Sequence, residues 1–313
     1  MDLHSRPPWS NNAVRRLGVA LRDGVDPPVD CPSYAEVMLW HADLAAEVQD
    51  RIEGRSWSAS ELLVTSRAKS QDTLLAKLRR RPYLQLNTIQ DIAGVRIDAD
   101  LLLGEQTRLA REIADHFGAD QPAIHDLRDH PHAGYRAVHV WLRLPAGRVE
   151  IQIRTILQSL WANFYELLAD AYGRGIRYDE RPEQLAAGVV PAQLQELVGV
   201  MQDASADLAM HEAEWQHCAE IEYPGQRAMA LGEASKNKAT VLATTKFRLE
   251  RAINEAESAG GGGGGGWLCR RIQPAHPRAS HHRVRHPARS DGAPVEAGSR
   301  AHRQQYRDRC ARQ

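Results

Sequence analysis

The chain has 313 residues, 42% hydrophobic and 26% charged, a composition that suits one or two domains with a sizeable core. Lys and Arg number 40, as do Asp and Glu, so the formal net charge is zero. The four cysteines are far apart without a C-x-x-C pair, which argues against a zinc site or a disulfide framework and favours a reducing cytosol. We find no secretory signal and no run near the roughly 18 apolar residues of a membrane span, so the sequence predicts a cytoplasmic protein without a membrane partner.

The first part of the chain is predicted to be a loose lead-in followed by two helices and a strand. Residues 1–32 contain "RPPW" and "DPPVDCPS", and prolines at this density disfavour helices and strands. The segment "SYAEVMLWHADLAAEVQDRIE" predicts an amphipathic helix that Ser33 and Glu36 cap. We expect "ELLVTSRAK" to form a short strand and "SQDTLLAKLRRR" a helix that ends before Pro82.

The next segments alternate between strand and helix patterns. "IAGVRID" predicts a strand, "LGEQTRLAREIADHFG" a helix, and "YRAVHVWLRL" and "RVEIQIRT" two strands that "PAG" joins into an antiparallel hairpin. "ILQSLWANFYELLADAYG" predicts a helix that covers the sheet. Residues 33–180 are therefore expected to form an α/β domain, a mixed β-sheet with flanking helices.

Residues 181–259 are predicted to form a helical extension. Apolar residues recur there on a seven-residue step, at Leu194, Met201, Leu208 and Trp215. An ordinary helical cap on the α/β core is the favoured interpretation, because heptads over fewer than about four repeats are weak evidence for a coiled coil. The alternative is an assembly surface for a homo-oligomer.

Residues 260–313 are predicted to be a glycine linker and a disordered basic tail. Gly260–Gly266 are consecutive glycines, and from Trp267 onward 11 Arg and no Lys stand against 3 acidic residues. Such charge could bind nucleic acid through phosphates. The favoured interpretation is a solvated tail without function, or one translated from a shifted reading frame.

Two short motifs supply candidate phosphate and metal ligands. In "RAKSQDT", Arg67 and Lys69 lie where a strand leads into a helix, and Lys77 follows on that helix. Cations at a helix start oppose its dipole, so a bound polyphosphate would explain them, although a basic surface turn is the commoner explanation. In "QDIAGVRI", Asp91 precedes a strand, which suits a magnesium ligand or, more commonly, a turn cap.

Two further motifs place polar groups on one side of a hairpin. In "AGYRAVHVWL", Tyr135 could stack on a purine base or lie in the core, and His139 falls on the polar side of its strand. Period-two alternation in "RVEIQIRT" puts Glu150, Gln152 and Arg154 on one face. If the hairpin forms, these side chains and His139 converge, and a shared ligand explains a carboxylate beside an arginine better than a core ion pair does.

In this order and with these intervals, the four motifs resemble the synthetase domain of RelA/SpoT-type alarmone synthetases. The resemblance covers about Ser33–Gly173, and "GYRAVH" with "VEIQIRT" is its most specific part. It implies a nucleotidyltransferase-like sheet and a pyrophosphokinase reaction, in which the 3′-hydroxyl of GDP or GTP attacks the β-phosphorus of ATP and AMP leaves. It also implies Mg²⁺ as the cofactor.

The resemblance assigns a role to each matching residue. Asp91 and Glu150 would hold magnesium, and Glu150 would also accept the proton of the attacking hydroxyl. The remaining positions would contact the substrates: ATP at Arg67 and Lys69, phosphates at Lys77 and Arg154, the guanine ring at Tyr135, and the acceptor at His139 and Gln152.

The chain departs from the family pattern in one loop. "HPHAGY" replaces the usual "P-K-x-N-G-Y", is one residue shorter and has His132 in place of the lysine. This change leaves open a toxin-type relative that pyrophosphorylates the 3′ end of tRNA, or a catalytically inactive nucleotide-binding regulator. The presence of both Asp91 and Glu150 favours an active enzyme. His41 and Asp43 are not adjacent, so no hydrolase metal pair is expected.

Overall fold

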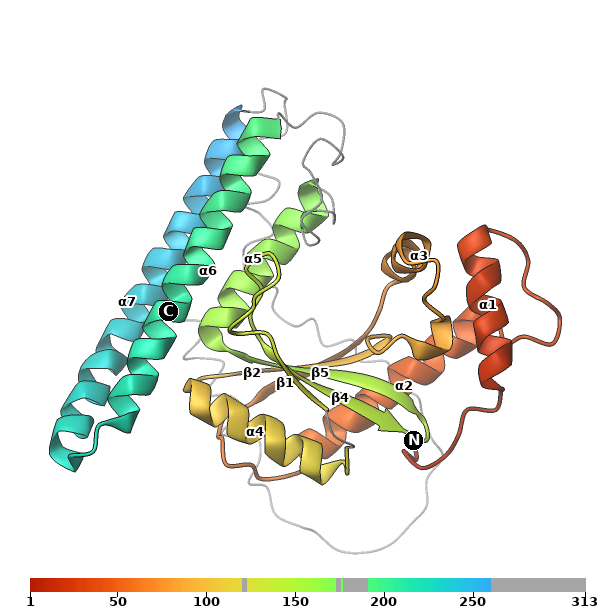
Figure 1. Ribbon diagram of the computed structural model, residues 1–313, viewed down its shortest axis with the longest axis horizontal. Coiled ribbons are helices and arrows are strands. Elements are labelled where there is room, and N and C mark those ends of the chain that lie inside the picture. Colours follow the sequence, from red (N-terminus) through yellow and green to blue (C-terminus); the bar gives the residue numbers. More distant parts are fainter. Residues whose placement is uncertain (120–122, 173–175, 177–190, 260–313) are drawn as a thin grey trace, which may run out of the picture. The chain divides into compact units, whose positions relative to one another are not determined.

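The fold is a mixed sheet with flanking helices, as the sequence predicts, and it has five strands, of which the short strand Ile124–Asp126 was not expected (Figure 1). The computed structural model describes residues 1–119, 123–172, 176 and 191–259. The strands are β1 (Leu63–Ala68), β2 (Ala93–Ala99), β3 (Ile124–Asp126), β4 (Val138–Leu144) and β5 (Gly147–Thr155), in the order β1-β2-β5-β4-β3. The helices are α1 (Asn11–Asp23), α2 (Tyr34–Glu53), α3 (Gln71–Arg80), the 3₁₀ turn η1 (Leu86–Thr88), α4 (Leu103–His116), α5 (Ile156–Tyr172), α6 (Pro191–Glu220) and α7 (Pro224–Ala259).

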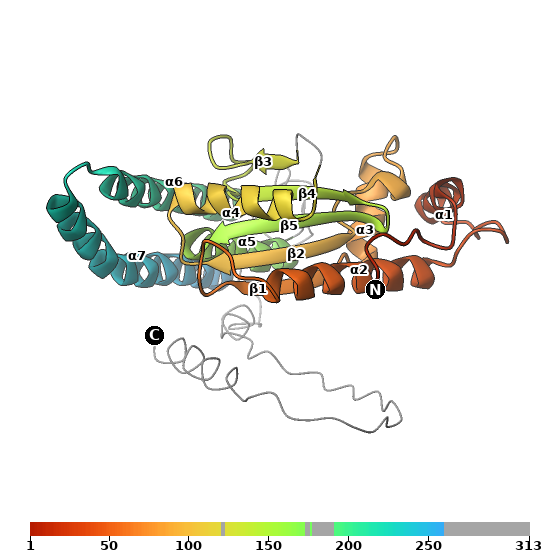
Figure 2. The ribbon, with the colours of Figure 1, turned by 90° about the horizontal axis from the view of Figure 1, so that it is seen from below.

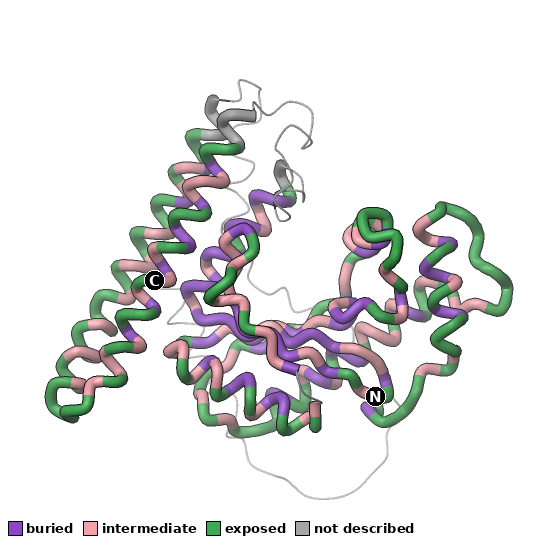
Figure 3. The backbone as a smooth tube through the Cα atoms, in the orientation of Figure 1, coloured by how far each residue is buried: buried purple, intermediate pink, exposed green. Residues whose placement is uncertain are grey.

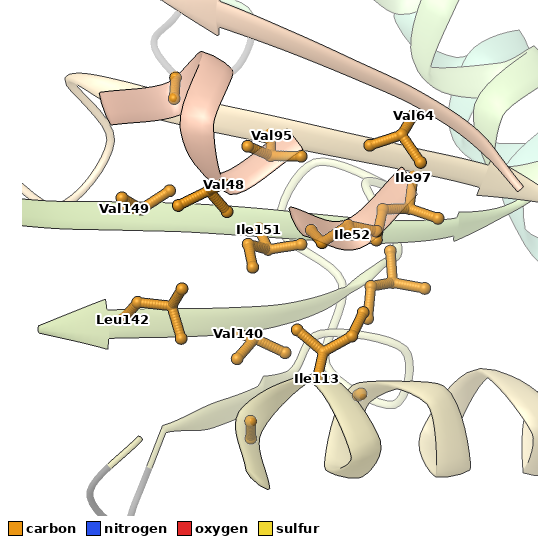
Figure 4. Packing of buried hydrophobic residues seen from close by; sticks show 14 of the residues in the cluster. Val48, Ile52, Val64, Val95, Ile97, Ile113, Val140, Leu142, Val149 and Ile151 are labelled. Carbon is orange, nitrogen blue, oxygen red and sulfur yellow. The ribbon is translucent and has the colours of Figure 1, made fainter. Parts of the chain in front are cut away.

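One face of the sheet is apolar and forms the main core. Val149, Ile151 and Ile153 of β5 are completely buried on it, together with aliphatic residues of β2 and β4. Helices α2 and α4 cover this face, with Val48 and Ile113 packed among the strand side chains (Figures 2 and 4). Because strand side chains alternate, burying this set directs the polar residues between them to the opposite face.

The predicted β4–β5 hairpin is confirmed. Leu144 pairs with Gly147 across a two-residue turn, and His139 pairs with Gln152. The strand begins three residues later than "YRAVHVWLRL" suggested, because the backbone N–H of Tyr135 donates to the carbonyl of His132 and closes a turn instead of joining the ladder. Tyr135 is thus presented by a turn at the start of β4.

The prediction of a loose lead-in over residues 1–32 is wrong in its middle part, which forms α1. The prolines flank this helix without interrupting it, the Ser10 hydroxyl accepts the N–H of Ala13, and Gly24 ends it at a φ of 71°. Val14 and Leu17 of α1 pack with buried residues of α3 and of the segment after it, in a second cluster that also includes Leu74, Leu78, Leu86, Ile89 and Ile92. Helix α1 therefore stabilises the position of α3 through this apolar cluster.

The helical extension packs on α5 and shares a third apolar cluster with it. Met201, Leu208 and Trp215 of α6 are buried against Trp161 and other residues of α5, while most of α7 is exposed (Figure 3). This packing fits the interpretation of a cap on the α/β core. Residues 181–190, the side chain of Leu194 and the predicted linker and tail over 260–313 lie outside what the structure describes.

Two findings bear on the remaining expectations about the chain. Among the described residues, no helix is both long and apolar enough to cross a membrane. All described residues belong to one compact unit, which lies within Met1–Pro274.

The core assignment makes a direct prediction about stability. Ile151→Ala should lower the free energy of unfolding by about 2–5 kcal/mol, because it leaves a cavity in the central strand. The matched control is Leu63→Ala in edge strand β1, where the side chain is 52% exposed and the expected loss is below about 1 kcal/mol. Urea unfolding monitored by circular dichroism measures both, and equal losses in the two variants would contradict the assignment.

Candidate functional site

The second face of the sheet is polar, and its side chains form rows across neighbouring strands. In one row Arg67 of β1 aligns with Gly94 of β2, Gly94 with Glu150 of β5, and Glu150 with Trp141 of β4. Directly paired side chains are about 4.5–5.5 Å apart at their Cβ atoms. Gly94 contributes no side chain between Arg67 and Glu150, and a Cβ at that position would lie 3.9 Å from Cγ of Arg67.

The next two rows add cations and amides. Arg96 aligns with Gln152, Gln152 with His139, and Asp98 with Arg154. The parallel pairing of β2 with β5 therefore brings Arg96 and Gln152, 56 positions apart, into one polar surface with His139 of β4.

Glu150 is held by donors on both carboxylate oxygens. Oε1 accepts the indole N–H of Trp141 at 3.2 Å and lies 3.4 Å from Nδ1 of His139, while Oε2 accepts Nε2 of Gln152 at 2.8 Å. Burial raises the pKa of Glu150, but the contact with His139 outweighs it and the net pKa is lowered. Glu150 is 9% exposed and ionised at neutral pH.

His139 and Arg154 both contact the hydroxyl of Tyr135. Burial disfavours the charged imidazole, but Tyr135 and Glu150 raise the pKa of His139 to about 9, so it is a cation at neutral pH. Tyr135 lies 3.0 Å from Nε2 of His139 and accepts Nη2 of Arg154 at 2.9 Å. The Arg154 guanidinium also lies over the tyrosine ring, 4.9 Å from its centre.

Arg154 is the most buried charged group of this surface. It is 2% exposed, and its Nη2 also donates to Oε1 of Gln152 at 2.9 Å. Its Nη1 has no hydrogen-bond partner among the described residues. A buried donor without a partner costs roughly 1–3 kcal/mol, which an anionic ligand reaching this atom would offset.

A second carboxylate lies where β2 begins. Asp91 accepts a hydrogen bond from Nζ of Lys69 and another, at 2.8 Å, from Nζ of Lys77. Burial raises the pKa of Asp91, but the two lysines outweigh it and bring the pKa down to about 2. The negative charge of Asp91 also raises the pKa of Glu150.

The structure brings the predicted site residues together on the polar face or at its end. Glu150, Gln152, Arg154 and His139 converge as expected, and Asp91 is surrounded by Lys69 and Lys77. Arg67 is exposed on the edge strand. Tyr135 lies beside His139 and Arg154, with its ring edge-on to the imidazole.

Sequence reasoning assigned no role to Trp141, Arg96 or Arg136. Trp141 lies two residues after His139 in β4, and Arg96 lies between the buried Val95 and Ile97 in β2. The alternation of side chains along a strand could therefore have placed both residues on the polar face. The Arg136 side chain donates to Ser205 on α6, about 70 residues away, and no local pattern indicates that contact.

The carboxylates of this site suit a hard divalent cation that takes some of its ligands from the protein and the others from a substrate. The described residues contain no group of three or more His, Cys, Asp and Glu side chains arranged to enclose a metal ion. Mg²⁺ needs only one or two carboxylates and completes its shell with water and phosphate oxygens. Asp91 and Glu150 meet that requirement, and the surrounding cations suit phosphate groups.

The chain is similar to known proteins of one family. Residues 66–168 match the family model described as a region found in RelA / SpoT proteins. The chain is 30% identical over 166 residues to the GTP pyrophosphokinase YjbM of Bacillus subtilis (strain 168), an alignment that covers 46% of this chain and 74% of that protein.

Solved structures of the small alarmone synthetase 1 from Bacillus subtilis are also similar. One is 22% identical, with a TM-score of 0.44, and covers 59% of this chain and 94% of that one. Another, bound to its product pppGpp, is 21% identical, with a TM-score of 0.45, and covers 61% and 98%. From the family match and the identity to the GTP pyrophosphokinase, we conclude that the chain belongs to the RelA/SpoT family.

Proposed function

We propose that this chain is a magnesium-dependent (p)ppGpp synthetase that transfers pyrophosphate from ATP to the 3′-hydroxyl of GDP or GTP and releases AMP. The observation that carries the proposal is the pair of carboxylates, Asp91 and Glu150, each held by cations: Asp91 by Lys69 and Lys77, and Glu150 by His139. Transfer of a phosphoryl-type group requires positioning, a metal and positive charge around the phosphates. The identity to a GTP pyrophosphokinase supports the same reaction.

The residues divide between the two substrates. Arg67, Lys69 and Lys77 surround the ATP phosphates, and Tyr135 stacks on the guanine ring. Glu150 accepts the proton of the 3′-hydroxyl as the bond from that oxygen to the β-phosphorus forms and the bond from the β-phosphorus to the AMP oxygen breaks. Its lowered pKa keeps the carboxylate ionised, as a proton acceptor must be.

The acceptor-side residues hold Glu150 and the nucleotide. His139 and Gln152 orient the Glu150 carboxylate and line the acceptor site, and Nη1 of Arg154, which is buried without a hydrogen-bond partner among the described residues, is the donor for a phosphate oxygen. Bound Mg²⁺ would be held by Asp91 and Glu150 and would neutralise charge on the phosphates.

The 3′ end of tRNA is the second candidate acceptor. The loop "HPHAGY", which ends at Tyr135 and has His132 in place of the family's lysine, would permit it. Incubating the pure protein and Mg²⁺ with ATP labelled on the β-phosphate and, separately, GDP, GTP or tRNA decides between them. Labelled guanosine product supports the proposal, labelled tRNA supports the alternative, and no transfer with any acceptor indicates an inactive nucleotide-binding regulator.

Replacement of the proposed base should abolish transfer. Glu150→Gln keeps the side-chain shape but removes the negative charge that binds the metal and accepts the proton, so kcat should fall at least about 100-fold. The control is Glu233→Gln, at an exposed position of α7. Both variants should retain the circular dichroism spectrum of the wild type, and normal turnover in Glu150→Gln would remove Glu150 from the mechanism.

The lysines beside Asp91 should oppose metal binding in the absence of nucleotide. Lys77→Met removes one of two cations that neutralise Asp91, so Mn²⁺ alone should bind several-fold more tightly, while ATP should bind more weakly. Titration followed by electron paramagnetic resonance measures free Mn²⁺. Lys246→Met, where the lysine is 48% exposed, is the control, and unchanged Mn²⁺ affinity in Lys77→Met would contradict the expectation.

Tyr135 should contribute to acceptor binding more than to ATP binding. Tyr135→Ala is expected to weaken GDP binding by roughly 1–3 kcal/mol, the range for a lost base–aromatic stack. Calorimetric titration measures GDP and a non-hydrolysable ATP analogue separately, and Tyr83→Ala, at an 80% exposed tyrosine, is the control. A lower melting temperature with unchanged GDP binding would instead identify Tyr135 as a core residue.

A further inference from the structure

The turn that presents Tyr135 is packed against two helices. Ala133 has a φ of 51° and Gly134 a φ of 87°, both in the left-handed region, and Tyr135 N–H donates to His132 to close the turn. A Cβ on Gly134 would lie 2.8 Å from the Trp161 ring of α5 and 3.4 Å from Cβ of Ser205 on α6. A side chain at position 134 would therefore clash with the ring of Trp161.

One hydroxyl of α6 contacts the residues on both sides of Tyr135. The Ser205 hydroxyl donates to the carbonyl of Gly134 at 2.5 Å and accepts Nε of Arg136 at 3.2 Å. Ser205 is 4% exposed, so water does not readily replace these bonds. Arg136 also donates to the carbonyl of Arg128, which connects the turn to the segment after β3.

Helix α6 is itself anchored before and after Ser205. One turn earlier, the carbonyl of Met201 accepts the indole N–H of Trp161 at 2.6 Å. Two turns later, the buried carboxyl of Glu212 accepts the hydroxyl of Thr155, at the end of β5, and Nε2 of Gln158 at 3.1 Å. Ser205 thus occupies a fixed position relative to the sheet.

We infer that Ser205 is a positioning residue of the acceptor site, and that α6 holds Tyr135 in the orientation that binds the acceptor base. The inference rests on the proposed function, because it names Tyr135 as the group through which Ser205 acts. Tyr135 has its own contacts with His139 and Arg154, so loss of Ser205 frees the backbone of the turn without removing the ring from the site.

Ser205→Ala tests this inference. GDP should bind roughly five- to tenfold more weakly, the equivalent of the net worth of about one hydrogen bond, while the affinity for a non-hydrolysable ATP analogue stays within about twofold. Ser235→Ala, at an exposed position of α7, is the control. The titrations are made on the full chain well below the melting transition, so that a loss of stability alone does not alter the affinities.

A double-mutant cycle separates positioning from a general structural role. In a Tyr135→Ala background, Ser205→Ala should cause no further loss of GDP affinity, because the group that it positions is absent. Full additivity of the two losses, or unchanged GDP affinity in Ser205→Ala, would overturn the inference.

Amide hydrogen exchange tests the same inference without any ligand. Exchange at the Tyr135 amide should accelerate in Ser205→Ala and not in Ser235→Ala, because that amide closes the turn that Ser205 holds. Unchanged exchange would refute positioning by Ser205. Wild-type protein that fails to bind GDP would refute the proposed acceptor instead, and the exchange experiment would still decide the role of Ser205.

Discussion

The parallel pairing of β2 with β5 is the contact on which the site depends. It sets Gly94 beside Glu150, and its next two polar pairs set Arg96 beside Gln152 and Asp98 beside Arg154. A shift of one residue would turn the polar set of one strand into the apolar core, where burying charges costs several kcal/mol each. The core packing of Ile151 and its neighbours against α2 and α4 therefore also fixes the register of the polar surface.

The polar surface keeps buried charge by mutual neutralisation. Glu150 is paired with a protonated His139 and Asp91 with two lysines, while Arg154 donates to the hydroxyl of Tyr135, a neutral group. Buried charges are tolerated when each has a partner. These partners are of the types that phosphates and a divalent cation would supply, so ligand binding can exchange one set of ionic contacts for another at modest cost in desolvation.

Helices outside the sheet support the two sides of this surface. On one side α1 packs against α3, and Lys77 of α3 forms an ion pair with Asp91. On the other side α5 and α6 enclose the turn before β4, through Trp161 and Ser205. The segments that sequence patterns described as a lead-in and an extension thus stabilise the elements that hold candidate site residues.

Local sequence patterns determined most of the elements, the alternation of polar and apolar faces and the β4–β5 hairpin, because a helix period, a strand period and a short turn are each encoded within a few residues. The four motifs identified the family and the convergence of Glu150, Gln152, Arg154 and His139. Only the tertiary structure decided the strand order, the partners of Asp91, the helix within residues 1–32 and the contact of Ser205 with Gly134. These features depend on contacts between residues that are far apart along the chain. The shape complementarity of the whole core decides which apolar surfaces pack together, and no local sequence pattern contains that information.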